Sequence, residues 1–219
     1  MGLMHLINTL SLDPVAAIRT GLRIIHFIGL ALGLGAATVL DLMIFRFFLN
    51  GKVTSERWAI FDFGSKIVNA GLLLLWITGF GFLAYYGAFE PIKFGNEKVW
   101  AKMLIVLILT INGLFIHAVI LPKVKAQIGR SLLAGMSTRQ KSVLLTSGAI
   151  SATSWYVPLL LGALPQLNFV VPMTTILLAY ALILALVAAV SHGVLLVVPN
   201  GSGDGVSARG PLMGQAIAA

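Results

Sequence analysis

Three of the four histidines lie inside apolar segments that are long enough to cross a lipid bilayer: His26, His117 and His192. Because hydrocarbon offers no water to hydrogen-bond to an imidazole, an ionisable side chain in such a segment indicates a functional site. The neutral imidazole is also a common ligand of metals and of haem iron. These three histidines are therefore candidate cofactor ligands.

Two of the histidines are predicted to lie at the same depth. His117 precedes Pro122 by five residues and His192 precedes Pro199 by seven, in segments that run in the same direction across the membrane. A helix rises about 1.5 Å per residue, so both imidazoles would lie in the leaflet where these segments end. Two imidazoles on different helices can ligate the two faces of haem b, which predicts His117 and His192 as axial ligands. The alternative is that each imidazole only hydrogen-bonds to a neighbouring helix.

The third histidine is predicted near the other membrane surface. At about 100° per residue, Arg19, Arg23 and His26 share one helical face. Arginine pairs with carboxylates in bidentate geometry, so the two arginines could bind haem propionates above a ligating His26. They could equally extend to lipid headgroups. Small residues on this face, Gly29 and Gly33, are typical both of cofactor sites and of helices that pack closely together.

Asp41 lies deep in the same apolar segment as His26. An unpaired carboxylate in lipid is costly, so we expect it to pair with Arg46, Lys66 or a histidine. It would then be a structural ion pair, a member of a proton relay, or the acceptor for the N–H of a ligating imidazole.

The composition indicates what must position these side chains. The chain is 58% hydrophobic and only 10% charged, whereas a soluble domain carries roughly 25% charged residues. A spanning helix needs about 20 mostly apolar residues, and five such segments can be placed. We predict an all-α, polytopic transmembrane helix bundle that forms one domain over residues 1–199. An interfacial amphipathic segment (residues 1–17) would precede it, and a flexible Gly/Ser-rich tail (residues 200–219) would follow. The predicted spans are residues 18–49, 58–86, 97–122, 142–163 and 170–198.

The charges predict an orientation and exclude several classes of protein. The net charge is +8, and twice as many lysines and arginines fall on one predicted side as on the other. This bias predicts an external N-terminus and a cytoplasmic C-terminus in a bacterial inner membrane. Basic loops beside anionic headgroups explain the charge without a nucleic acid partner. The absence of cysteine excludes disulfides, iron–sulfur clusters and c-type haem.

Two stretches resemble known bacterial membrane families. Arg23-Ile-Ile-His26-Phe-Ile-Gly29, and Val99-Trp100-Ala-Lys102 followed by His117, are similar to the CopD-like copper-resistance domain and to the HemJ-type protoporphyrinogen oxidase. The resemblance covers about half the chain. It implies functional roles for His26 and Lys102 and the presence of haem b.

These observations predict an integral membrane protein that binds haem b and transfers electrons, as a subunit of a larger membrane redox complex. Three alternatives remain open: a HemJ-like porphyrinogen oxidase, a non-catalytic scaffold or assembly subunit, and a copper-handling membrane protein. The expected partners are membrane lipids and other subunits of such a complex.

Overall fold

The computed structural model describes residues 2, 4, 13–50, 52–131 and 135–197. The predicted interfacial segment lies largely outside these residues, and the predicted tail lies wholly outside them. Within the described part the chain is all-α, with isolated β-bridges but no strand.

Five helices in the described residues are long and apolar enough to cross a membrane, which confirms the predicted bundle. The third span, α4, continues through a π-helical turn, η2 (Ile116–Ile120), into the short helix α5 (Leu121–Lys125). All five spans begin and end within about one turn of the predicted bounds. The spanning helices are α2 (Pro14–Asn50), α3 (Ser55–Phe89), α4 (Glu97–Phe115), α6 (Thr138–Ala163) and α7 (Met173–Val197).

Side-chain caps define where several of these helices begin, α3 and α6 among them. Thr54 caps α3, its hydroxyl accepting a hydrogen bond from the Arg57 amide at 3.3 Å. Ser137 and Gln140 form a reciprocal capping box at the start of α6. Such caps satisfy amide groups that have no partner inside the helix.

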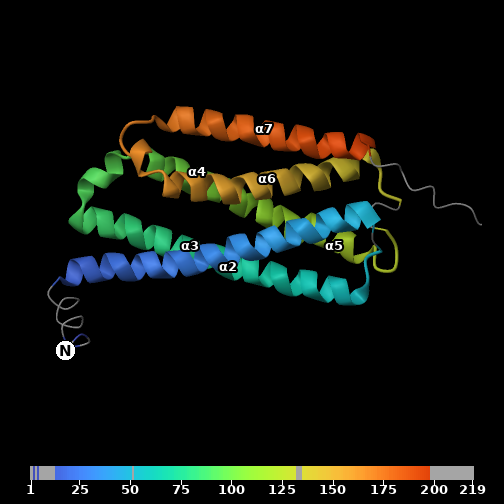
Figure 1. Cartoon of the computed structure of the whole chain (residues 1–219), viewed down its shortest axis with the longest axis horizontal. Coiled ribbons are helices and arrows are strands. Elements are labelled where there is room, and N and C mark those ends of the chain that lie inside the picture. Colours follow the sequence, from blue (N-terminus) through green and yellow to red (C-terminus); the bar gives the residue numbers. More distant parts are fainter. Residues whose placement is uncertain (1, 3, 5–12, 51, 132–134, 198–219) are drawn as a thin grey trace, which may run out of the picture.

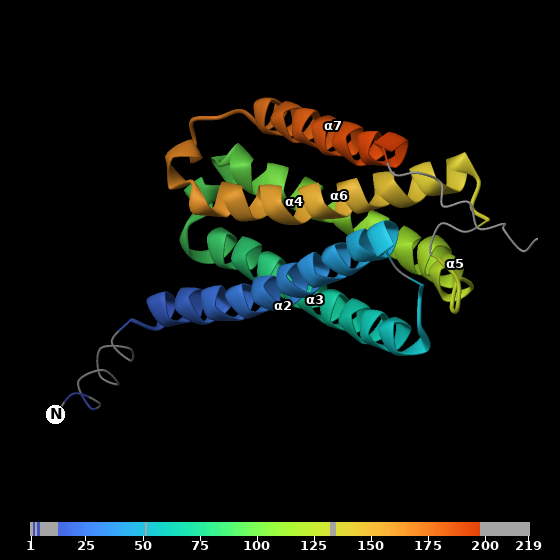
Figure 2. The same ribbon diagram turned by 45° about the vertical axis from the view of Figure 1, so that its right-hand side comes forward.

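The helices form two groups that meet at α6. α2 and α3 lie antiparallel to each other, while α4, α6 and α7 pack together beside them, and α6 also contacts α2 (Figures 1 and 2). In α6, 44% of the most apolar window is buried inside the protein, against 11% in α7. α6 is therefore the central helix. This explains why it is the least apolar span: its buried Ser147, Ser151 and Ser154 face protein instead of lipid.

Glycines allow α2 and α3 to approach closely. A Cβ atom on Gly71 of α3 would lie within 3 Å of backbone atoms of Gly29 and Gly33 of α2. Gly33 also lies against the indole of Trp155 from α6, which is only 3% exposed. The Gly29–Gly33 face is thus a helix-packing face, one of its two predicted uses.

The two ends of the bundle are closed differently. At one end, the loop before α3 pairs with the loop after α5: the Val53 amide donates to the Arg130 carbonyl at 2.9 Å, and the Gly129 amide donates to the Val53 carbonyl at 2.7 Å. Val53 is fully buried there.

At the other end, the first residues of α4 bind the connection between α6 and α7. Lys98 Nζ donates to the Leu164 carbonyl at the C-terminus of α6, at 2.9 Å. The Glu97 carboxylate accepts from the Met173 amide at the start of α7, at 2.6 Å. A cation at a helix C-terminus and an anion at a helix N-terminus are both favoured by the helix dipoles.

Candidate imidazole site

His26 on α2 is hydrogen-bonded to Thr78 on α3. Its Nδ1 atom lies 2.7 Å from Thr78 Oγ1, and the Thr78 hydroxyl donates to the Leu74 carbonyl at 2.6 Å. A hydroxyl has one proton to donate, so when Thr78 donates to Leu74 it accepts from His26. His26 therefore carries its proton on Nδ1, and the lone pair of its Nε2 atom accepts no hydrogen bond from any residue that the structure describes. This is the tautomer of an imidazole that ligates a metal through Nε2.

The surroundings hold this imidazole in place. Thr78 is 1% exposed, and the ring of Phe82, one turn further along α3, packs edge-on against His26 with a centroid distance of 5.7 Å. His26 itself is half-buried. The imidazole is thus fixed by α3 while part of its surface remains accessible.

Lys102 on α4 belongs to the same region. Its ammonium group lies close enough to His26 for its charge to act on the imidazole. The charge that acts on Lys102 is that of another cation, Lys98, and no described side chain accepts a hydrogen bond from Lys102. Lys102 is thus a half-buried cation with no anionic partner among the described residues, and its charge acts on His26.

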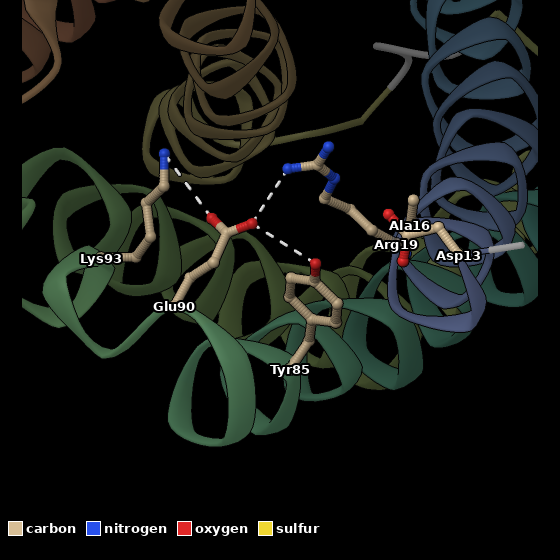
Figure 3. Close-up of polar contacts among 6 residues, drawn as sticks. All are labelled: Asp13, Ala16, Arg19, Tyr85, Glu90 and Lys93. Carbon is tan, nitrogen blue, oxygen red and sulfur yellow. Dashed lines mark hydrogen bonds and ion pairs between the residues drawn. The ribbon is translucent and has the colours of Figure 1, made fainter.

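Arg19 is already paired with another group. Its Nη1 atom lies 2.9 Å from Glu90 Oε1, to which the Tyr85 hydroxyl also donates at 3.4 Å (Figure 3). Lys93 lies 3.9 Å from the other oxygen of Glu90. Glu90 thus joins the start of α2 to the end of α3 and pairs with Arg19, one of the two arginines predicted to bind either haem propionates or lipid headgroups. In the described residues Arg23 has no ion-pair partner.

His117 differs from His26 in the hydrogen bond that its ring forms. Its Nε2 atom lies 2.9 Å from the amide nitrogen of Asn69 on α3, which can only donate. The Nε2 lone pair is therefore occupied. His117 lies in the π-helical turn, and π-turns often occur at functional sites. Ligation through this nitrogen would require Asn69 to move.

His192 on α7 hydrogen-bonds to its own helix. Its Nδ1 atom lies 2.8 Å from the Ala188 carbonyl, so Nδ1 carries the proton and Nε2 keeps its lone pair. His117 and His192 thus have different partners, on α3 and on α7. Their joint ligation of one haem stays a prediction.

Asp41 does not have the partner that was expected. Lys66 pairs instead with Asp62, one turn before it on α3, at 2.8 Å. Within the described part of the chain, no histidine or cation pairs with Asp41, and no charged group affects it measurably. The expected ion pair with Arg46, Lys66 or a histidine is therefore not formed there. Its role as a proton relay stays a prediction.

Sequence reasoning missed the residues that decide the state of each histidine, Thr78 and Asn69. Both are polar residues inside the second apolar segment, and that isolation was the available signal. Among the described residues, no group of three or more histidine, cysteine or acidic side chains could hold a metal ion on its own. Comparison with protein-family models, curated proteins and solved structures found no match to this chain.

Proposed function

We propose that this chain is a membrane haem b-binding protein of electron transfer, with His26 as an axial ligand. The observation that supports it is the hydrogen bond from His26 Nδ1 to Thr78, which leaves Nε2 free to ligate. Ligating histidines characteristically donate their other N–H in this way. Haem b would supply one-electron redox chemistry at its iron.

The nearby cations fit the carboxylates of such a cofactor. Lys102 has no anionic partner, and Arg23, one turn before His26 on α2, has none among the described residues. Haem carries two propionates, and cations without partners near an imidazole would neutralise them. Arg19, bound to Glu90, is not assigned to this role.

The optical spectrum of the purified protein tests the proposal. Wild-type protein produced with haem supplementation should show a Soret band, and H26A should lose it. The matched controls H117A and H192A, which each remove another intramembrane imidazole, should keep the spectrum.

Two results would contradict this assignment. Loss of the spectrum in H117A and H192A, with H26A unchanged, would place the haem between α4 and α7. Absence of a Soret band in wild-type protein would exclude haem and leave the scaffold and copper-handling alternatives.

The closeness of Lys102 to His26 favours a second candidate, a porphyrinogen oxidase of the HemJ type. Under this proposal K102M should lower the rate of porphyrin formation by about 10²–10⁴-fold, the usual contribution of an acid–base group. The Soret band should persist in K102M. Equal rates in K102M and in the control K93M, with haem present, would exclude the oxidase and leave electron transfer as the proposed function.

The location proposed for the chain is a bacterial inner membrane, with the N-terminus outside and the C-terminus in the cytoplasm. Five apolar helices make it a multi-pass membrane protein. The bias of lysine and arginine supports the orientation. Other subunits of a membrane redox complex are the proposed partners, since a haem in electron transfer needs a donor and an acceptor.

A further inference from the structure

A cavity lies among α2, α3, η2, α6 and α7. Its volume is about 200 Å³, and its walls are almost entirely apolar. Asp41 is the one charged residue in the lining; Phe61, Gly148, Val187 and Ser191 are among the others. The residues of the imidazole site, His26, Thr78 and Lys102, are not part of it.

Asp41 gives this cavity its chemical character. The carboxyl group has no ion-pair partner in the described residues, and Lys66, the cation expected to neutralise it, is bound to Asp62. A carboxylate that is removed from water is strongly disfavoured unless a cation or a hydrogen-bond donor compensates it. Among the residues that the structure describes, none provides either of these to Asp41.

Two of the three serines that line the cavity already donate their hydroxyl protons. The Ser191 hydroxyl donates to the Val187 carbonyl at 2.8 Å, and the Ser147 hydroxyl donates to Asn112 Oδ1 at 2.9 Å. These two hydroxyls have used their single proton and offer lone pairs to a ligand, whereas Ser151, which also lines the cavity, forms no side-chain hydrogen bond to a described residue. With Asp41 as the one charged residue in the lining, a ligand that fits it carries positive charge on an otherwise apolar body.

We propose that this cavity is a binding site for a compact lipophilic amine, whose ammonium group pairs with Asp41 while its hydrocarbon body contacts the apolar walls. Charge complementarity selects this class, because Asp41 is the one charged residue in the lining and no described cation pairs with it. The proposal concerns a site distinct from the imidazole site and does not depend on haem.

Binding of 1-adamantylamine to the full chain in discs of zwitterionic lipid tests this, by calorimetric titration with empty discs subtracted. The neutral analogue 1-adamantanol has the same hydrocarbon cage without the charge. Wild-type protein should bind the amine saturably and at least about tenfold more tightly than the alcohol, as expected for a hydrogen bond to a charged group. This comparison needs no variant to fold.

Three variants locate the site. D41N should reduce the affinity for the amine to that for the alcohol. D62N removes a carboxylate that is already paired with Lys66 and should leave amine binding unchanged. G148L should fill the cavity and abolish binding of both compounds, since a Cβ atom at Gly148 meets nothing within 4 Å. Thermal unfolding of each variant verifies that it is folded.

Several outcomes would overturn the proposal. These are equal affinity of wild-type protein for amine and alcohol, amine binding that D41N does not weaken, and amine binding that survives in G148L. Tighter binding of a short-chain quinone than of the amine would assign the cavity to a neutral acceptor ligand.

Discussion

At the scale of single residues, the partner of an imidazole decides what the imidazole can do. His26 and His117 both lie in membrane-spanning segments. Thr78 accepts a hydrogen bond from His26, whereas Asn69 donates a hydrogen bond to His117. The first arrangement leaves a nitrogen lone pair for a metal and the second occupies it. The chemical difference therefore lies in two residues of α3.

Replacing Thr78 by valine should weaken haem binding without removing the ligand. Valine keeps the shape of threonine but cannot accept the Nδ1–H of His26, and loss of such a partner typically costs 10–100-fold in affinity for a metal. We expect a T78V protein to retain a Soret band and to release haem to a haem acceptor about 10–100-fold faster.

Thr110 provides a matched control for this change. Its hydroxyl also donates to a backbone carbonyl, that of Val106 at 2.8 Å, and also accepts from an aromatic nitrogen, Trp76 Nε1 at 2.9 Å. T110V should release haem at the wild-type rate. Equal release from both variants would show that Thr78 does not act through His26.

The sequence identified the three intramembrane histidines but not which residue hydrogen-bonds to each ring. The histidines are visible because they interrupt apolar runs. Thr78 is 52 residues away from His26 and Asn69 is 48 residues away from His117. Which polar residues meet depends on the rotation of each helix about its axis, and that follows from packing. The same reason explains why the partner expected for Asp41 is absent from its surroundings.

At the scale of helices, the α2–α3 contact depends on the absence of side chains. G71A should destabilise the protein by about 1–3 kcal/mol, the usual cost of overpacking, because the added methyl group would meet backbone atoms that cannot move aside. Unfolding by denaturing detergent in mixed micelles measures this free energy.

Gly35 on α2 is the control, since a Cβ atom there meets nothing within 4 Å. G35A should be neutral or stabilising by up to about 1 kcal/mol, because alanine is the better helix former. Similar losses in the two variants would mean that the effect does not come from the α2–α3 contact.

The sequence predicted the spans well and the π-turn not at all. Apolar length is enough to locate a spanning helix. The turn at η2 has a local cause, however. Pro122 has no N–H to donate, and its ring disfavours a regular turn before it. The Leu121 amide bonds five residues back, to Ile116, and so the backbone widens around His117.

At the scale of the whole molecule, the two ends of the bundle differ in how their charges are used. At the end where α4 begins, Arg19 and Lys93 pair with Glu90, and Lys98 binds a backbone carbonyl. At the other end, Lys125 is exposed. Because Lys66 also pairs with Asp62 near that other end, both ends neutralise part of their charge, and the proposed orientation rests on the numerical bias of lysine and arginine.

Cysteine labelling in intact cells tests this orientation, and the natural chain has no cysteine to interfere. Ile92, 75% exposed, and Lys125 lie at opposite ends. An impermeant maleimide should label I92C in intact cells and K125C only after the membrane is opened. The reverse pattern would invert the proposed topology.

The sequence did not predict which of the five spans pack against each other, with one exception. Side chains that face lipid and side chains that face another helix are equally apolar, so composition does not show which helices meet. The central position of α6 is the exception, since its serines need protein around them. Their concentration in one span already indicates burial.

The start of α4 has a consequence for how the chain is made. Glu97 and Lys98 bind groups near Leu164 and Met173, which a ribosome produces more than sixty residues later. Until then, the carboxylate and the ammonium can be solvated at the membrane surface. When α6 and α7 enter the bilayer, Glu97 and Lys98 can bind the ends of these two helices and so fix the position of the α6–α7 hairpin. The order of synthesis thus becomes an order of assembly, in which the first three helices select the position of the last two.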